Sequence, residues 1–208
     1  SGPSSSILPA PLATLSQTVK HGLWWDIDST KSLKDGVHYK QQLLTLGIDH
    51  LMVMLDSSSP DNPDVPKVKW SPERFERFAR LMSPEIEVGV TFWGRPRMGY
   101  IKAILDILPR FVAAGATRVE LDGEGNWRKR HLNGIQNMED AGFLLGTRLA
   151  ALKASSSGKL KSVEFTSYLE HEEFDVPTVA RWADVIVPQS YSHYNEGEAT
   201  SSLAGVYG

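Results

Sequence analysis

Hydrophobic and polar positions follow two different periods along the chain. Short runs rich in apolar residues indicate β-strands, and longer stretches with apolar residues three or four positions apart indicate helices. The predicted strands are His21–Asp28, His50–Asp56, Ile86–Trp93, the stretch that begins at Arg118, Ser162–Tyr168 and Ala183–Tyr191. The predicted helices are Val37–Leu46, a helix that begins after Ser71, Tyr100–Ala114, a helix over about Met138–Ala154, and Val176–Trp182. This regular order predicts an α/β protein with a parallel sheet.

Local signals mark several helix boundaries. Ser71 is a typical N-cap residue, and Pro72 suits the first helical position. Gly47 suits the residue that follows a helix. Pro109 lies inside the third predicted helix, where it removes a backbone hydrogen bond. We therefore expect a kink in that helix, or two shorter helices.

The repeating strand–helix units predict a (β/α) barrel of the TIM type. Polar residues gather where the predicted strands end, and barrel enzymes carry their catalytic groups at the carboxyl ends of the strands. A doubly wound sheet is the alternative, but no glycine-rich phosphate loop follows the first strand. A complete barrel has eight strands in roughly 250 residues. Because only six units are visible in 208 residues, we expect strands seven and eight to be missing or truncated, with an open or partial barrel as the alternative.

The chain divides into an N-terminal segment and one predicted domain. Residues 1–17 are rich in Ser, Pro and Ala, which is typical of an interdomain linker or a remnant of cloning. Residues 18–208 form the predicted barrel domain, which we expect to be incomplete at its C-terminal end.

Period-two alternation assigns the strand side chains to two faces of the sheet. The outward set is almost wholly apolar, as packed helices require: Leu23, Ile27, Val53, Leu55, Val88, Val90, Val119, Leu121, Val163, Phe165 and Ile186. The inward set becomes polar toward the strand ends: Trp24, Asp26, Asp28, Met52, Met54, Asp56, Gly89, Thr91, Trp93, Glu120, Asp122, Glu124, Glu164, Thr166, Tyr168, Val187, Gln189 and Tyr191. This division predicts that acids from several strands meet at one mouth of the barrel.

Composition narrows the chemistry that this mouth could perform. The net charge of -3 gives no basic surplus for nucleic acid, and no apolar run is long enough to cross a membrane. The chain has no cysteine, which excludes disulfides and thiolate metal sites. His171 and His193 lie near strand ends, but no metal-ligand spacing accompanies them, so we predict neither a metal nor another cofactor.

Three acids share one face of the fourth predicted strand, where stability alone does not explain them. Like charges and burial push the pKa values of neighbouring carboxyls apart, which suits acid/base catalysis, although a solvated acidic strand is the alternative. Glycoside hydrolysis needs one carboxylic acid to protonate the leaving oxygen and a second carboxylate nearby. We assign Glu124 as the general acid and Asp122 as its partner, with Asp26 or Asp28 on the other side of the sugar.

Further residues at the strand ends are candidates for substrate binding. Aromatic faces stack on sugar rings, which makes Trp93, Trp127, Tyr168 and Tyr191 a possible sugar platform, although aromatic residues are more often core. Four polar residues complete the predicted substrate site: Asp28, Asp56, Glu120 and Gln189. Two structural alternatives stay open, in which Asp26 and Asp28 cap strand ends and Asp56 bonds its own loop.

These acids resemble the motifs of two glycosidase families. Asp122-Gly-Glu124, with Asp26-Ile-Asp28 on the first strand, resembles the family 25 glycoside hydrolases, TIM-like muramidases of phages and bacteria. The stretch that ends at Glu124 is also similar to the Asp-x-x-Asp-x-Asp-x-Glu motif of family 18 chitinases, and Gln189-Ser-Tyr191 is similar to the segment with the family 18 tyrosine that holds the acetamido group. Thr117 and Glu120 stand where family 18 has Asp, and the Asp that family 25 has near the sixth strand is absent.

The family 25 resemblance implies an endolysin-type peptidoglycan hydrolase. The expected partner is the bacterial cell-wall polysaccharide, and a wall-binding domain would precede the barrel in the full protein. Such an enzyme is secreted or released to the cell wall, although no signal peptide is visible. Two alternatives remain for the acidic mouth: a metal-dependent hydrolase and a non-catalytic carbohydrate-binding barrel.

Overall fold

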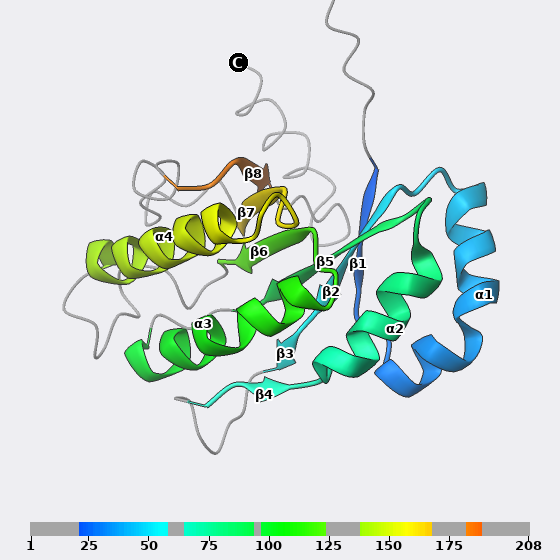
Figure 1. Cartoon of the computed structure of the whole chain (residues 1–208), viewed down its shortest axis with the longest axis horizontal. Helices are drawn as coiled ribbons and strands as arrows, with labels where there is room; N and C mark the ends of the chain where they lie inside the picture. The colour runs from blue at the N-terminus through cyan, green and yellow to red at the C-terminus, as the bar shows by residue number, and fades with distance from the viewer. Residues whose placement is uncertain (1–20, 58–64, 94–96, 124–137, 168–181, 189–208) are drawn as a thin grey trace, which may run out of the picture.

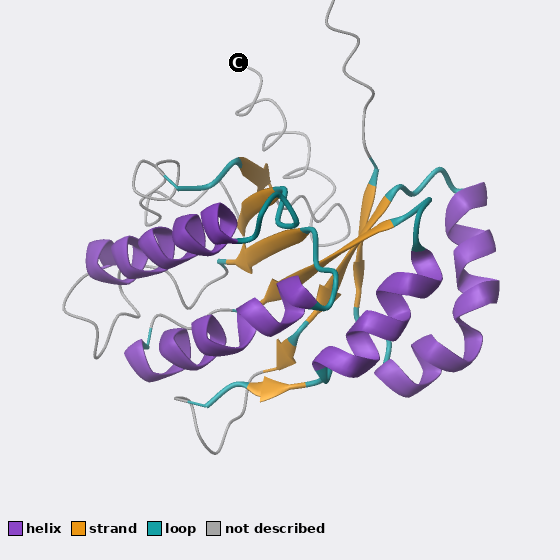
Figure 2. Cartoon of the chain, viewed as in Figure 1, coloured by secondary structure: helices purple, strands orange, loops and turns teal. Residues whose placement is uncertain are grey.

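The fold is a parallel six-stranded sheet with helices packed on it, in strand order β1-β2-β5-β6-β7-β8 (Figures 1 and 2). The structure, a computed structural model, describes residues 21–57, 65–93, 97–123, 138–167 and 182–188. The sheet strands are β1 (Gly22–Trp25), β2 (His50–Met54), β5 (Glu87–Phe92), β6 (Arg118–Asp122), β7 (Ser162–Ser167) and β8 (Val185–Pro188). The helices are α1 (Ser29–Thr45), α2 (Pro72–Met82), α3 (Met98–Ala113) and α4 (Met138–Ser155). The predicted α/β barrel-type fold is confirmed as a half-barrel.

The face of the sheet under the helices forms the core, as the period-two pattern predicted. Strand residues on this helix face are fully or almost fully buried: Leu51, Val53, Val88, Val90, Val119, Leu121, Val163 and Phe165. Trp25 extends the core at one side, where its ring lies 5.5 Å from that of Phe78 on α2. Leu23 is the exception in the predicted outward set, because it lies on the edge strand β1 and stays 44% exposed.

Helix α2 follows its sequence signals closely. The Ser71 hydroxyl accepts a hydrogen bond from the Arg74 backbone N–H at 3.3 Å, and Pro72 opens the helix. The apolar stripe of Phe75, Phe78 and Met82 is completely buried. The N-cap and the first helical position predicted for this helix are both confirmed.

Helix α1 begins eight residues earlier than the pattern predicted, at Ser29 rather than Val37. The Asp28 carboxylate accepts hydrogen bonds from the backbone N–H groups of Thr30 at 2.8 Å and Lys31 at 3.3 Å. Asp28 is therefore the N-cap of the helix, and the prediction that it ends the first strand is wrong, since β1 stops at Trp25. The helix pattern was hidden because its first turns bury small residues such as Ser32 and Gly36.

Two further details differ from the sequence prediction, and a third predicted element lies mostly outside the described residues. Helix α3 runs unbroken through Pro109, so the prediction of two shorter pieces is wrong. The long loop after β2 contains a short antiparallel pair, β3 (Asp56–Ser57) with β4 (Lys67–Val68), which the sequence did not indicate. The helix predicted over Val176–Trp182 lies outside the described residues except for Trp182, which is in a turn.

None of the described helices has the length and apolar character needed to cross a membrane.

Candidate functional site

The face of the sheet opposite the helices, here called the lumen face, carries the acids of β6. The sheet register places Thr91 of β5, Glu120 of β6 and Glu164 of β7 side by side. Asp122 is two residues further along β6 and lies beside Thr166 of β7. These five side chains are all buried. The parallel sheet thus gathers polar groups at mid-height and at the carboxyl ends of its central strands, as the alternation predicted.

Glu120 is held from the opposite side of the half-barrel. Its Oε1 accepts a hydrogen bond from the Trp24 indole N–H at 2.9 Å, and its side chain is almost fully buried. Burial raises the pKa of Glu120 to about 7; the Thr91 hydroxyl and the Trp24 indole pull it down, and the nearby Glu164 raises it. A carboxyl with this pKa changes its protonation near neutral pH, which is the property that acid/base chemistry uses.

Asp122 is the last residue of β6 and lies on the same face as Glu120. Two residues of a strand span about 6.6 Å, which keeps the two carboxyls within electrostatic reach of each other. Gly123 follows, and its backbone N–H donates to the carbonyl of Thr166 at 2.8 Å. A Cβ at Gly123 would lie 2.4 Å from the Phe165 ring, so only glycine lets the chain pass this close to β7. This close passage fixes the place of Asp122 at the strand end.

Asp56 and Trp93 connect the carboxyl ends of two neighbouring strands. Asp56 is buried just after β2, and its Oδ1 accepts a hydrogen bond from the Trp93 backbone N–H at 2.7 Å, just after β5. The Asp56 carboxylate thus bonds the end of a neighbouring strand rather than only its own loop. This contact gives Asp56 a structural role at the mouth and leaves its predicted role in substrate binding as a prediction.

The acids after β1 lie at the surface of the described structure. Asp26 pairs with the Lys69 ammonium at 2.6 Å, and its side chain is 67% exposed. Asp28 is the cap of α1, and hydrogen bonds from the backbone N–H groups of Lys31 and Thr30 lower its pKa. Five predicted site residues lie outside the described residues: Glu124, Trp127, Tyr168, Gln189 and Tyr191. The structure therefore brings Glu120 and Asp122 together and places Asp28 in a helix cap.

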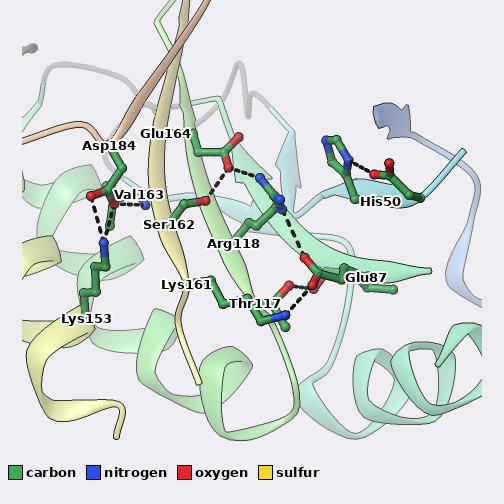
Figure 3. A network of polar contacts seen from close by, with 12 residues as sticks. His50, Glu87, Thr117, Arg118, Lys153, Lys161, Ser162, Val163, Glu164 and Asp184 are labelled. Carbon is green, nitrogen blue, oxygen red and sulfur yellow. Dashed lines mark hydrogen bonds and ion pairs between the residues drawn. The ribbon is translucent and has the colours of Figure 1, made fainter. Parts of the chain in front are cut away.

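A charged network at the amino ends of the strands was missed from the sequence (Figure 3). Arg118 is at its centre, with its guanidinium 2.6 Å from Glu164 and 3.5 Å from Glu87. Lys161 also pairs with Glu87, and the Ser162 hydroxyl donates to Glu164. These five residues are called the amino-end network. The available signal was the alternation itself, because Glu87, Arg118 and Glu164 fall on the lumen face by the same period of two.

The described residues place no three His, Asp or Glu side chains together as a possible metal site. What they do place together is a buried, protonatable carboxyl and a second acid at a strand end. Such a pair can donate or accept a proton, or stabilise a positive charge that develops beside it.

Comparison with known proteins shows what fold the chain resembles. No protein-family model and no curated protein sequence matches the chain. Among solved structures, the chain is similar to a beta-N-acetylhexosaminidase from Bacteroides fragilis NCTC 9343, with a TM-score of 0.52 and 11% identity over 83% of this chain and 51% of that chain. A mandelate oxidase variant matches with a TM-score of 0.45 and 15% identity over 80% of this chain and 48% of that one. The chain thus spans about half the length of these two proteins.

A third solved structure is the tryptophan synthase alpha chain from Legionella pneumophila subsp. pneumophila, with a TM-score of 0.35 and 14% identity over 81% of this chain and 79% of that chain. At 11% identity, the likeness to the hexosaminidase shows the fold alone, a TIM-barrel type of α/β architecture. The chemistry of this chain must therefore be argued from its own residues.

Proposed function

We propose that this chain is the catalytic part of a glycoside hydrolase that cleaves an N-acetylated polysaccharide, with bacterial peptidoglycan as its substrate. One observation carries the proposal: Glu120 and Asp122 are buried on the lumen face of the central strand β6, with Asp122 at its carboxyl end. Catalytic groups of barrel enzymes lie at this end of the strands, because the loops that follow form the active site.

The proposed mechanism assigns one role to each acid of this strand. The Glu124 carboxyl donates its proton to the glycosidic oxygen as the bond between that oxygen and the anomeric carbon breaks. Asp122 orients the substrate acetamido group, whose carbonyl oxygen stabilises the positive charge at the anomeric carbon. Water then adds its hydroxyl to that carbon and returns a proton to Glu124. Glu120 lies deeper in the half-barrel, and its protonation state changes the electrostatic potential at Asp122.

Two observations other than the burial of the β6 acids support the proposed substrate class. The name of the Bacteroides fragilis enzyme specifies an N-acetylated hexosamine substrate, and that enzyme shares this fold. The family 25 resemblance of Asp122-Gly-Glu124 favours peptidoglycan among such polymers. Under this proposal the protein acts at the bacterial cell wall and its partner is the wall polysaccharide.

The test is digestion of purified peptidoglycan, followed by turbidity and by mass spectrometry of the soluble products. New reducing ends on muramic acid identify a muramidase, and reducing ends on glucosamine identify a glucosaminidase. We expect Glu124→Gln to lower the rate by roughly 10²- to 10⁴-fold, the range for removal of a general acid. Glu76→Gln is the matched control, because Glu76 is a half-exposed acid on α2, paired with Arg80 and remote from the lumen face.

Two other outcomes would replace this proposal with its alternatives. Peptidoglycan that is bound but not cleaved, by a folded chain, would indicate a carbohydrate-binding barrel. Cleavage that is lost with a chelator and restored with zinc would indicate a metal-dependent hydrolase. Wild-type rates in Glu124→Gln would show that Glu124 is not the acid.

A further inference from the structure

The hydrogen bond between Trp24 and Glu120 crosses the half-barrel. Trp24 is on the edge strand β1 and Glu120 is on β6, with β2 and β5 between them in the sheet. Three spacings between neighbouring strands cover about 14 Å along the sheet. The sheet is curved, which brings the two side chains together across the lumen face. The Trp24 indole nitrogen therefore lies only 2.9 Å from Oε1 of Glu120. This contact joins the first strand directly to the acids of the fourth strand in the sheet.

The contact is specific to one oxygen of the carboxyl group. The indole N–H can only donate, and it donates to Oε1 of Glu120. In a neutral carboxylic acid, the carbonyl oxygen accepts hydrogen bonds and the hydroxyl oxygen carries the proton. An N–H group fixed on Oε1 therefore makes Oε1 the carbonyl oxygen and directs the proton to Oε2.

We propose that Trp24 is a positioning residue of the candidate site: its indole N–H fixes the Glu120 carboxyl across the lumen face and directs its proton to Oε2. The inference rests on the proposed function for its meaning, since a neutral Glu120 leaves Asp122 as the charged partner of the general acid. The contact itself belongs to the folded chain and can be measured without a substrate.

The charges around Glu120 are compatible with this role. Five ionisable side chains lie on the lumen face of the described strands around Glu120. They are Asp122 and Arg118 on β6, Glu164 on β7, Glu87 on β5 and His50 on β2. Arg118 forms ion pairs with Glu164 and Glu87. Two neutral groups also act on the carboxyl: the hydroxyl of Thr91 on β5 and the indole of Trp24 on β1, and both lower its pKa. Burial then favours the neutral form of Glu120, whose pKa is raised to about 7.

The neighbouring residue of β1 provides a matched control. Trp25 points to the helix face, and its indole N–H donates to the Ser32 hydroxyl at 2.9 Å. The substitutions Trp24→Phe and Trp25→Phe each keep an aromatic ring and remove one indole N–H. A general loss of stability affects both variants, whereas loss of positioning affects the first one alone.

The first measurement is a pH titration of the wild-type chain by NMR. We expect the indole proton resonance of Trp24 to change with a midpoint near 7, following Glu120, and that of Trp25 to stay unchanged in this range. The response of Trp24 should disappear in Glu120→Gln. A Trp24 resonance that does not change with pH, or that changes in the same way in Glu120→Gln, would overturn the proposal.

The second measurement follows the Glu120 carboxyl carbon in chains labelled with ¹³C-glutamate. Because the indole N–H stabilises the charged carboxylate, we expect Trp24→Phe to move the midpoint upward by roughly half to one pH unit. Trp25→Phe should leave it in place. A midpoint that is the same in Trp24→Phe and the wild type would overturn the proposal, and the wild-type indole titration decides the question if Trp24→Phe does not fold.

These readouts separate the inference from the proposed function. A chain that shows both titrations but cleaves no glycan would refute the glycosidase proposal and leave the positioning of Glu120 intact. A chain that cleaves peptidoglycan but lacks the titrations would refute the positioning role alone. In an active enzyme, the pH profile of kcat/KM should shift in Trp24→Phe and not in Trp25→Phe.

Discussion

Glu120 and Glu164 are direct neighbours in the sheet, on adjacent strands and on the same face, yet their surroundings differ. Both side chains are almost completely buried. Glu164 forms an ion pair with Arg118 at 2.6 Å and accepts a hydrogen bond from Ser162. Glu120 accepts its hydrogen bond from the neutral indole of Trp24.

The difference shows how one sheet can use the same residue type for two purposes. A carboxylate paired with a guanidinium keeps its charge and ties strands together. A carboxyl buried among neutral donors can hold a proton near neutral pH, as the raised pKa of Glu120 indicates. Glu164, tied into the amino-end network, therefore serves stability, whereas Glu120 at the same height of the sheet and Asp122 at the carboxyl end of β6 are available for chemistry.

Removal of Arg118 is expected to give the largest loss of stability. Arg118→Met would leave Glu164 buried without its cation, which typically costs about 3–5 kcal/mol. Urea unfolding of the variant measures this loss. Arg80→Met is the control, since the exposed pair of Arg80 with Glu76 should contribute less than about 1 kcal/mol. Equal losses in the two variants would contradict a structural role for the amino-end network.

Glu120 should make the stability depend on pH in the opposite sense to an ion-paired acid. Its pKa rises from 4.5 to about 7 on folding, so the folded chain binds more protons than the unfolded chain between these values. This contribution to stability is present below pH 4.5 and is lost as the pH rises through 7.

The expected loss from Glu120 is about 2–3 kcal/mol between pH 5 and pH 8. Glu120→Gln keeps an acceptor for the Trp24 N–H and removes the titration, so its stability should fall less over this range. Urea unfolding at the two pH values measures the difference. Identical pH dependence in the wild type and Glu120→Gln would show that Glu120 is charged in the folded chain at neutral pH.

Ser162 tests the ion-paired acid by a smaller change. Ser162→Ala removes a hydroxyl donor from Glu164 but leaves the Arg118 pair in place. Since a typical hydrogen bond contributes about 1 kcal/mol, we expect a loss of that size in urea unfolding. The Glu120 titration should move little, because Arg118 still pairs with Glu164. A loss as large as that of Arg118→Met would show that the hydroxyl, and not the cation, is the main partner.

Asp28 offers a third kind of acid, an exposed helix cap, and the smallest expected effect. Asp28→Ala removes the acceptor for the N–H groups of Thr30 and Lys31 and should lower Tm slightly. Asp28→Asn should keep the cap and the Tm, because Asn is an equally good N-cap residue. If Asp28→Asn keeps its Tm but loses peptidoglycan cleavage, Asp28 has a role in the site beyond its cap.

The sequence predicted the layers of the fold better than its local details. Alternation assigned Val119 and Leu121 to the helices and Glu120 to the lumen face, because a strand side chain has only two directions to take. The start of α1 was missed because Asp28 reads equally well as a strand end and as a helix cap. The β3–β4 pair was missed because two-residue strands carry no period.

The candidate site was predicted as a set of acids but not as a set of contacts. Asp122 and Glu120 were named from their shared face. Their different surroundings depend on which strands lie next to each other and on the curvature of the sheet. The pairing of Arg118 with Glu164 links residues 46 positions apart, and that of Trp24 with Glu120 links residues 96 positions apart. No local pattern contains such contacts.

The role of the strand-end acids is tested most directly by comparing Asp122→Asn with the wild type in the digestion of purified peptidoglycan. The rate to measure is the formation of new reducing ends, at equal concentrations of folded protein confirmed by circular dichroism. We predict that Asp122→Asn lowers this rate by roughly 10²-fold or more, because the substituted amide cannot supply the negative charge beside the general acid. Reducing ends formed at the wild-type rate by folded Asp122→Asn would contradict the claim that these strand-end acids carry the chemistry.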